Sequence, residues 1–355
     1  MDGLLKLYGL LKPTFDKIYS IHLCSIDELE KLLSFIDEYW QKGHILTKSK
    51  ELLNWQHFDR NNQCYNFVIA TNNTGEIHGI LGFILSSIYD NDIVTPIRWG
   101  AIWKIREDVA IKGLGVMLKG FLEQRVPVDY IGGVGLSKYS KTIDEKLGEK
   151  MGRLSQYYIA NPNIKEYNLI SAPLFQANIQ NKNNKQMEYI LEKDFFEYAT
   201  KLEDKIMPYK SIKYYINRYY RHPIYKYEGI GIFENDEVIA ILIIRKASYK
   251  ENSCIFVVDY IGDGSELSGC YGLFLDLLQT YSAEYICFPC YGIRDSYMRE
   301  AGFSLREDSL MILPIYYEPF ERKNVELDFH FWTNSDFSGE IIVKGDSDQD
   351  RPNRV

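Results

Sequence analysis

The feature that most constrains the fold is the segment 105–123, in which a strand passes through a glycine-containing loop into an amphipathic helix. Gly113 and Gly115 allow tight turns of the backbone and let an anion approach it closely. Leu118 and Leu122 give the following helix an apolar face. A helix that starts in such a loop directs its first free N–H groups, and the positive end of its dipole, at the loop's contents. The segment therefore predicts an anion cradle suited to a diphosphate.

The spacing of the glycines separates this loop from other phosphate-binding loops. A P-loop ends in Gly-Lys followed by Ser or Thr, and the dinucleotide fingerprint has three glycines at another spacing. The hexapeptide Lys112-Gly113-Leu114-Gly115-Val116-Met117 instead resembles motif A of the GCN5-related N-acetyltransferase superfamily, written Gln/Arg-x-x-Gly-x-Gly/Ala. Lys112 stands where that motif has Arg or Gln, and Met117 stands where it has a small residue. An ordinary strand-to-helix turn is the alternative interpretation.

The elements expected around the loop follow the order of that superfamily. In chain order they are a strand over 77–85, a strand over 128–135, a helix over 142–154 and a strand over 156–159. At the front, Ser25 and Glu28 form a capping box for a helix that extends to Trp40. The resemblance covers residues 15–165 and implies an α/β fold with a mixed, mostly antiparallel central sheet flanked by helices.

The plan of elements repeats from about residue 225. Strands are expected over 227–233, 238–244 and 254–260, followed by a break at 262–264, a helix over 273–281 and a strand over 284–288. The segment 296–303, which contains Tyr297, resembles the superfamily's Tyr-x-x-x-Gly-Phe signature, with four residues instead of three between the tyrosine and the glycine. Two tandem domains are therefore expected. The chain is expected to divide into an acyl-CoA-binding domain over 1–165, a helical connection over 166–224, an acceptor-side domain over 225–320 without a phosphate loop, and a strand with a polar tail over 321–355.

The two copies differ in the residues that would serve catalysis. In the second copy, Asp263 and Glu266 occupy the position of the glycine loop and would repel a diphosphate. Only the first copy is therefore expected to hold coenzyme A. It has the segment 148–153 where the tyrosine signature would fall, so the tyrosine that often protonates the departing thiolate in the superfamily is missing there. Either the copies share a site, with Tyr297 supplied by the second, or the reaction needs no tyrosine.

Composition narrows the partners and the compartment. A net charge of −8 argues against nucleic acid as the main partner. The longest aliphatic run, 238–244, is too short to span a bilayer, and no signal peptide is expected. Six cysteines at irregular spacing form no disulfide framework, which favours the cytoplasm. Cys287 and Cys290 have no second pair at zinc spacing, so no metal is expected.

The resemblance implies direct transfer of an acyl group from coenzyme A to an amine. In that superfamily the pantetheine arm pairs with the fourth strand, here at Ile105, Glu107 and Val109, and a backbone N–H polarises the thioester carbonyl. The diphosphate would lie against the segment Lys112–Met117, through Lys112, Gly113, Leu114, Gly115, Val116 and Met117. A base must remove a proton from the acceptor, because an ammonium ion cannot attack.

Several side chains are candidates for catalysis and acceptor binding. His57 is the preferred base, because it lies in the segment that often lines the acceptor pocket in the superfamily, and Trp55 offers a face on which a ring can stack. A core or surface histidine is the alternative interpretation of His57. Glu107 is a further candidate base, and Tyr297 is a candidate acid. His222 is a candidate acceptor-binding residue, although His-Pro before a strand is also a common turn.

The polar C-terminal segment 344–353 lacks hydrophobic periodicity, and a frayed acidic tail is its default interpretation. It is similar to the tails of tandem acyltransferases of bacterial surface-polysaccharide pathways, which implies that Arg351 meets a substrate phosphate. This resemblance implies transfer of an acetyl or short hydroxyacyl group to the amine of a nucleotide-linked deoxyamino sugar. The alternatives are a Fem-type aminoacyltransferase that uses aminoacyl-tRNA and a non-catalytic binding or scaffold protein. The oligomeric state stays open.

Overall fold

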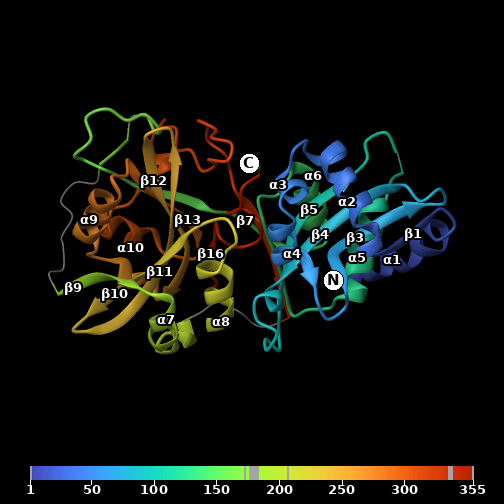
Figure 1. The fold of residues 1–355 in the computed structure, drawn as a ribbon, viewed down its shortest axis with the longest axis horizontal. Helices are drawn as coiled ribbons and strands as arrows, with labels where there is room; N and C mark the ends of the chain where they lie inside the picture. Colours follow the sequence, from blue (N-terminus) through green and yellow to red (C-terminus); the bar gives the residue numbers. More distant parts are fainter. Residues whose placement is uncertain are drawn as a thin grey trace. The chain divides into compact units, whose positions relative to one another are not determined.

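The computed structural model describes the chain except residues 1, 110, 172, 176–183, 206–207, 335–338 and 354–355. The chain divides into two compact units (Figure 1). The first unit comprises Met1–Gly152, Asp328–Asp336 and Pro352–Val355, and the second comprises Arg153–Leu327 and Phe337–Arg351. The main segment of the first unit thus ends at Gly152, whereas the sequence predicts a boundary near residue 165.

The first unit is built on one mixed sheet. In spatial order its strands are β1 (Tyr19–Ser25), β3 (Cys64–Asn72), β4 (Ile77–Leu85), β5 (Ile97–Ile105), β6 (Tyr130–Val134), β15 (Asp328–Thr333) and β7 (Lys150–Arg153), and the short β2 (Phe58–Asp59) pairs with β3. Neighbours from β1 to β5 are antiparallel, whereas β5 and β6 are parallel. The parallel pair is the one that a helical crossover connects.

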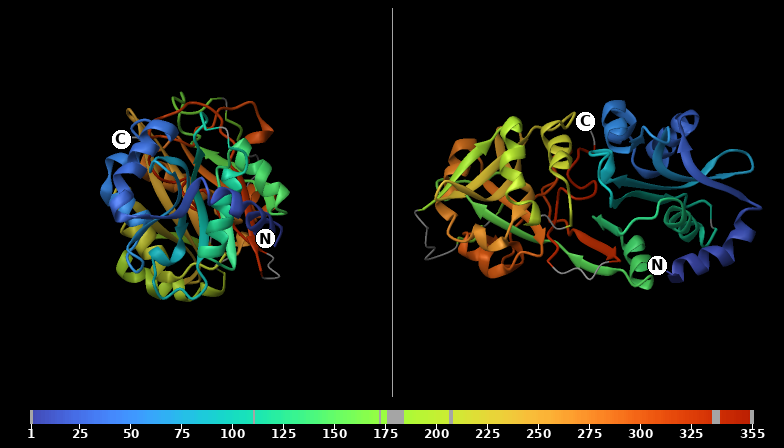
Figure 2. Two further views of the ribbon diagram at one scale, coloured as in Figure 1. Left: turned by 90° about the vertical axis from the view of Figure 1, so that its right-hand side faces the viewer. Right: turned by 90° about the horizontal axis from the view of Figure 1, so that it is seen from below.

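Two helical layers cover the two faces of this sheet. One consists of α2 (Leu29–Phe35), α3 (Ile45–Lys48) and α4 (Lys50–His57), and the other contains α1 (Asp2–Phe15) and α5 (Leu114–Arg125). Successive side chains of a strand point to opposite faces, so Phe67 of β3 packs under α2–α4 and Val68 packs under α1 and α5. The right-hand view of Figure 2 shows both layers. The crossover from β6 to β7 contains α6 (Lys138–Lys146).

The second unit repeats this plan. Its strands, in spatial order, are β14 (Ser304–Leu305), β8 (Ser155–Ala160), β13 (Tyr285–Tyr291), β12 (Asn252–Gly262), β11 (Glu237–Tyr249), β10 (Tyr227–Glu234) and β9 (Lys185–Ile190), and β16 (Ile342–Val343) pairs with β13. Its α-helices are α7 (Glu192–Thr200), α8 (Ile212–Tyr215), α9 (Tyr271–Tyr281) and α10 (Asp295–Glu300). Side chains of α9 and α10 pack with β11, β12 and β13 in one core.

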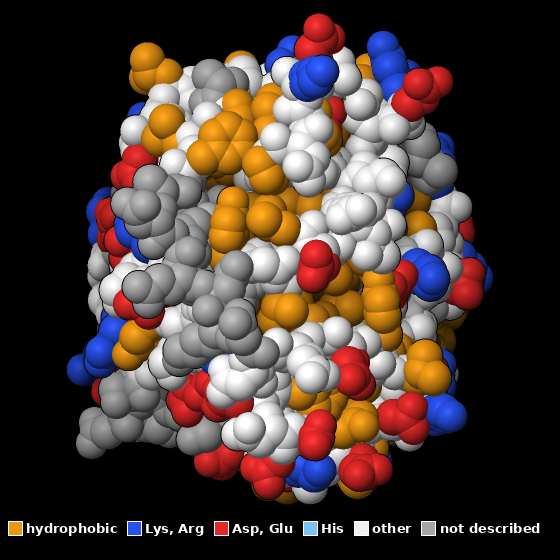
Figure 3. All heavy atoms as spheres, turned by 90° about the vertical axis from the view of Figure 1, so that its left-hand side faces the viewer, with side chains coloured by type: hydrophobic (Ala, Val, Ile, Leu, Met, Phe, Trp, Pro, Cys, Tyr) orange, Lys and Arg blue, Asp and Glu red, His pale blue; other side chains and the backbone are white. Residues whose placement is uncertain are grey.

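Short helical turns extend or connect these elements. The 3₁₀ turns are Ile26–Glu28, Ser86–Ile88, Glu203–Lys205, Gly264–Leu267 and Arg306–Asp308, and π-helical turns over Ile36–Trp40 and Ile216–Tyr220 continue α2 and α8. None of the helices described has the length and apolarity that crossing a bilayer requires. On the face of the second unit seen in Figure 3, apolar, acidic and basic side chains are interspersed. The described side chains of that face form no continuous basic band of the kind that binds a nucleic-acid backbone.

The two sheets exchange strands. β15, which follows the second copy in the sequence, lies between β6 and β7 of the first sheet, with His330 opposite Gly133. β8, which follows the first copy, lies between β13 and β14 of the second sheet. The strand expected over 156–159 therefore exists, but the expectation that it belongs to the first domain is wrong. Strand pairing is decided by contacts far apart in sequence, which a local pattern does not contain.

Two local expectations have different outcomes. The capping box is confirmed, because the N–H of Ser25 donates to Glu28 Oε2 at 3.1 Å and its Oγ donates at 2.8 Å. The helix expected over 142–154 is wrong at its end, because α6 stops at Lys146 and β7 starts at Lys150. Gly148 has a φ of 76°, in the left-handed region that glycine favours, and ends the helix there. The predicted fold class, two α/β domains with mixed sheets flanked by helices, is confirmed.

Candidate functional site

Strands β5 and β6 of the first unit form a fork. They pair over three positions only, of which the last joins Trp99 to Gly132. Beyond Trp99, β5 continues along β4 as far as Ile105, which lies opposite Gly79. Over the same stretch β6 stays beside β15. We call this divergence the β5–β6 fork, and its apex is the last residue pair.

The loop that leaves β5 ends at the start of α5, which has the geometry of an anion cradle. Gly113 is the residue before the helix and has a φ of 97°, a conformation that other residues rarely adopt. The first helical hydrogen bond runs from the N–H of Met117 to the carbonyl of Gly113 at 3.0 Å. The N–H groups of Leu114, Gly115 and Val116 precede that bond and have no acceptor within the helix. They are the donors that an anion would use.

Lys112, Gly115 and Met117, which are also predicted to line the cradle, differ in exposure and in what their side chains or backbone contact. Lys112 is exposed next to the helix start, as an anion-binding side chain should be. The side chain of Met117 is buried in the α1–α5 core and its N–H is already bonded, so this residue neither narrows the cradle nor donates to it. A Cβ on Gly115 would lie 3.3 Å from Cζ2 of Trp103, so this glycine also makes room for the indole.

The expectation that Ile105, Glu107 and Val109 share a strand is wrong. β5 ends at Ile105, and the N–H of Val109 donates to the carbonyl of Arg106 at 3.4 Å in a turn. Glu107 is exposed, and its ion pair with Lys104, at 2.7 Å, lowers the pKa of the Glu107 carboxyl. Of the three residues, Ile105 alone lies on the strand that borders the fork.

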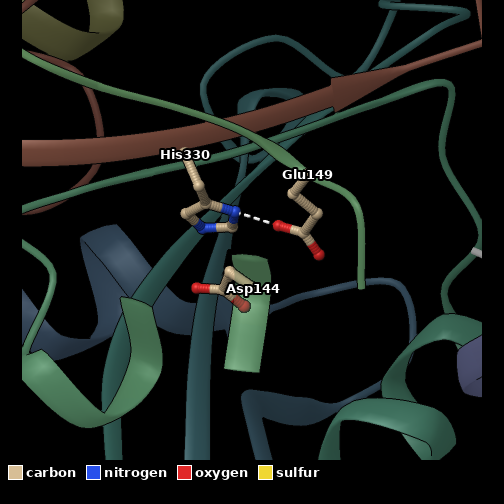
Figure 4. A group of neighbouring side chains, drawn as sticks. All are labelled: Asp144, Glu149 and His330. Atoms are coloured by element: carbon tan, nitrogen blue, oxygen red, sulfur yellow. Dashed lines mark hydrogen bonds and ion pairs between the residues drawn. The ribbon is translucent and has the colours of Figure 1, made fainter. Parts of the chain in front are cut away.

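A histidine lies at the apex of the fork, where the sequence predicts none. His330 reaches the first sheet through β15 and lies opposite Gly133. A Cβ on Gly133 would lie 2.5 Å from Nε2 of His330, and a Cβ on Gly100 would lie 4.0 Å from the same atom. The imidazole therefore lies over the residues that directly follow the last β5–β6 pair. Its Nδ1 is hydrogen-bonded to Glu149, as Figure 4 shows.

A buried ammonium group balances the carboxylates next to this histidine. Lys119 Nζ of α5 lies 2.5 Å from Asp144 Oδ1 and 2.6 Å from Glu149 Oε1. The end of α6 positions both acids, since the N–H of Glu149 donates to the carbonyl of Asp144 at 3.1 Å. Burial raises the pKa of Glu149, but the His330 hydrogen bond and the Lys119 charge outweigh it and lower the pKa to about 2. Glu149 is therefore a carboxylate at neutral pH.

The same residues are spaced for a metal ion but are occupied by a cation of the protein. Asp144, Glu149 and His330 each offer one ligand atom, and these atoms lie within 4.8 Å of one another. Burial lowers the pKa of Lys119, and the negative charges of Glu149 and Asp144 raise it. The charges outweigh burial, so the pKa lies above its usual value. A divalent ion would have to displace this ammonium group. The donor set thus fits a network centred on lysine better than a metal centre.

His57 lies away from any position that suits a catalytic base. It is fully buried, its ring centroid lies 4.7 Å from that of Phe67, and its Nδ1 lies 3.1 Å from the carbonyl oxygen of Phe83. Trp55, on the same helix, packs its ring 4.9 Å from that of Tyr89 and stays partly exposed. The burial of His57 supports the core-histidine interpretation and argues against the predicted role of base.

The remaining predicted residues belong to the second unit. His222 Nδ1 accepts hydrogen bonds from the N–H groups of Ile224 at 3.1 Å and Tyr225 at 2.9 Å, as in a structural turn. Burial and the charge of Arg218 lower the pKa of His222 to about 2. Tyr297 lies on α10 with its hydroxyl 3.4 Å from a nitrogen of Arg294, and the buried Arg351 pairs with Asp348 at 2.8 Å.

The second unit has a matching fork that its own chain fills. β12 and β13 pair at two positions only, the last being Phe256 with Cys287. Past that point β16 pairs with β13, with Val343 opposite Cys290, and the N–H of Gly345 donates to the carbonyl of Val258 of β12 at 2.8 Å. The segment 342–345 thus bonds to both diverging strands. We call it the C-terminal plug.

Charged groups hold the chain that follows the plug. Asp350 is fully buried and pairs with Arg245 at 3.0 Å and with Lys344 at 2.9 Å, and it accepts from the hydroxyl of Tyr227 at 2.7 Å. Burial alone raises the pKa of Asp350, but Arg245 and Lys344 lower it well below the usual range. The expectation of a frayed tail is therefore wrong, because its acids are paired inside the second unit.

Comparison with solved structures identifies the class of fold. A GCN5-related N-acetyltransferase from Anabaena variabilis ATCC 29413 superposes with a TM-score of 0.54, covering 88% of this chain and 72% of its own at 9% identity. A protein of unknown function from Enterococcus faecalis V583, called a probable N-acyltransferase, gives a TM-score of 0.54 over 87% of this chain and 72% of its own at 8% identity. No protein-family model and no curated protein sequence matches the chain. The fold is thus that of the GCN5-related N-acetyltransferases.

Proposed function

We propose that the chain is an N-acyltransferase that takes its acyl group from coenzyme A bound in the β5–β6 fork. The fork is the main observation behind this proposal, because β5 separates from β6 after Trp99 and leads through a loop into the start of α5, which Gly113 precedes. Backbone groups of β5 beyond Trp99 would hold the pantetheine arm. The N–H groups at the start of α5 would hold the diphosphate, with Lys112 adding positive charge.

The contrast between the two forks supports a single donor site. In the second unit, the plug forms hydrogen bonds with β12 and β13 that a pantetheine arm would otherwise need. Asp263 and Glu266 lie between β12 and α9, where a diphosphate would meet like charge. The second unit is therefore proposed to serve the acceptor side rather than to bind a second donor.

The proposed acceptor is the amine of a nucleotide-linked deoxyamino sugar, and the proposed acyl group is acetyl or a short hydroxyacyl group. This finer assignment rests on the sequence resemblance. The amine attacks the thioester carbonyl, a C–N bond forms, the C–S bond breaks, and coenzyme A leaves as its thiol. The proposed location is the cytoplasm. Arg351 is less suited to bind a substrate phosphate than expected, because it is buried and paired with Asp348.

Calorimetric titration with coenzyme A and acetyl-CoA tests the proposal. Lys112→Glu places a negative charge next to the diphosphate and is expected to weaken binding about tenfold, which corresponds to about 1.4 kcal/mol. The matched control is Lys250→Glu, which makes the same charge change at an exposed turn of the second unit and should bind like the wild type. A wild type without affinity for either ligand contradicts the proposal and favours the scaffold or the aminoacyl-tRNA alternative.

A further inference from the structure

The apex of the β5–β6 fork limits how far a bound donor can advance. The two strands pair as far as Trp99 and Gly132, so a pantetheine arm between them reaches no further than Gly100 and Gly133. The ring of His330 lies over these two glycines. The reacting carbonyl of a donor held in this way would therefore lie beside Nε2 of His330.

We propose that His330 is the catalytic base of the acyl transfer and that Glu149 is its positioning residue. The inference rests on the proposed function of the fork. The inference needs the amine to approach the thioester at the apex, where the imidazole of His330 lies against Gly133 and can take a proton from the amine.

The hydrogen bonds of His330 leave the required nitrogen available. Its Nδ1 faces the carboxylate of Glu149, which only accepts hydrogen bonds when ionised, so Nδ1 carries the proton in the neutral ring. Nε2 then holds the lone pair, and no described residue forms a hydrogen bond with it. The carboxylate also stabilises the imidazolium that forms after proton transfer.

One ammonium group and two acidic side chains surround the ring. The titratable groups packed against it are Lys119 of α5, Asp144 of α6 and Glu149 ahead of β7. Lys119 itself is no candidate base, because its ammonium group is held by both acids.

A single residue can move the proton through the whole step. As the amine nitrogen bonds to the thioester carbon, its proton passes to Nε2 of His330. The C–S bond then breaks, and the imidazolium returns the proton to the departing sulfur, which leaves as the thiol. The amide and coenzyme A are the only products. This route removes the need for the tyrosine that the first copy lacks at 148–153.

The test follows thiol release from acetyl-CoA with UDP-glucosamine as the amine. His330→Gln is expected to bind acetyl-CoA within about twofold of the wild type and to lower kcat about 100-fold or more, as loss of a general base does. Glu149→Gln should lower kcat about tenfold and leave the KM for acetyl-CoA within about twofold of the wild type, because it disturbs the position of the His330 ring and not the donor site. The control is His22→Gln, since His22 also pairs with a glutamate, Glu28, at 2.8 Å but lies on β1 outside the fork.

The outcomes separate this inference from the proposed function. A wild type that binds no acetyl-CoA, or that acetylates none of UDP-glucosamine, glucosamine and a lysine peptide, contradicts the proposed function. Binding and turnover by His330→Gln at the wild-type rate overturn the role of His330 alone. If that variant does not fold, the pH dependence of kcat in the wild type decides. A kcat that rises between about pH 5 and 8, where imidazoles titrate, supports a histidine base, and a kcat that stays constant over that range overturns the role of His330.

Discussion

Nδ1 of His330 is hydrogen-bonded to the carboxylate of Glu149 although 181 residues separate the two in the sequence. The strand exchange creates this contact, because β15 enters the first sheet next to β6. Glu149 is placed independently by the glycine that ends α6. Two distant parts of the chain therefore supply the histidine and the acid that lie together at the apex of the fork.

Loss of Lys119 should destabilise the first unit, because it leaves two buried acids unpaired. Lys119→Met leaves Asp144 and Glu149 buried without their cation, and we expect it to lower the free energy of unfolding by about 3–5 kcal/mol in chemical denaturation. Lys141→Met removes the more exposed ion pair with Asp328 and should change the free energy of unfolding by less than about 1 kcal/mol. Equal effects of the two substitutions would contradict this assignment.

Glu149 should also make the stability of the first unit depend on pH. Its pKa is lowered to about 2 in the folded protein from a usual 4.5. A lowered carboxyl pKa adds stability that is fully present above about pH 4.5 and is lost as the pH falls toward 2, with a total of about 3 kcal/mol. Glu149→Gln should flatten this part of the unfolding-energy profile. An unchanged slope in the variant would show that other carboxyl groups cause it.

Asp350 should stabilise the second unit by pairing with Lys344 of the C-terminal plug and with Arg245. Asp350→Ala leaves the buried Arg245 and Lys344 without their shared carboxylate and is expected to lower the free energy of unfolding by about 3 kcal/mol or more. Asp295→Asn, which breaks a half-exposed ion pair with Arg299 at 2.6 Å, is the control and should have little effect. Thermal unfolding of both variants gives the comparison, and a silent Asp350→Ala would mean that the plug is not held by these charges.

His57 should matter for stability and not for turnover. His57→Ala opens a cavity next to Phe67 and removes the hydrogen-bond donor to the Phe83 carbonyl, at a loss of about 2–4 kcal/mol of unfolding free energy. At a temperature where the variant stays folded, its kcat and KM with acetyl-CoA should equal those of the wild type. A large fall in kcat without a loss of stability would restore His57 as the base.

Much of the fold could be predicted because its signals are local. The capping box of Ser25 and Glu28, and the loop that leads into α5, depend on residues within a few positions of one another. The burial of His57 also had a local signal, since Leu52, Leu53, Gln56 and His57 follow the spacing of one helix face. A histidine at an apolar position of that face is better read as part of the core.

The exchanged strands and the apex of the fork had no such signal. The segment 328–333 reads as a strand of either unit, and nothing near it in sequence indicates that its neighbours are β6 and β7. His330 could therefore not be connected with Glu149 from the sequence. The course of the C-terminal segment could not be predicted for another reason. The acids that follow the plug are typical of a solvated tail, and their buried partners lie as far away as Arg245.

Amide hydrogen exchange with and without coenzyme A is the most direct test of where the donor binds. We predict that coenzyme A slows exchange at the end of β5 and across the start of α5, through residues 101–117, and leaves residues 256–270 of the second unit unchanged. Protection confined to the second unit, or no protection in either segment at saturating ligand, would contradict the assignment of the β5–β6 fork as the acyl-donor site.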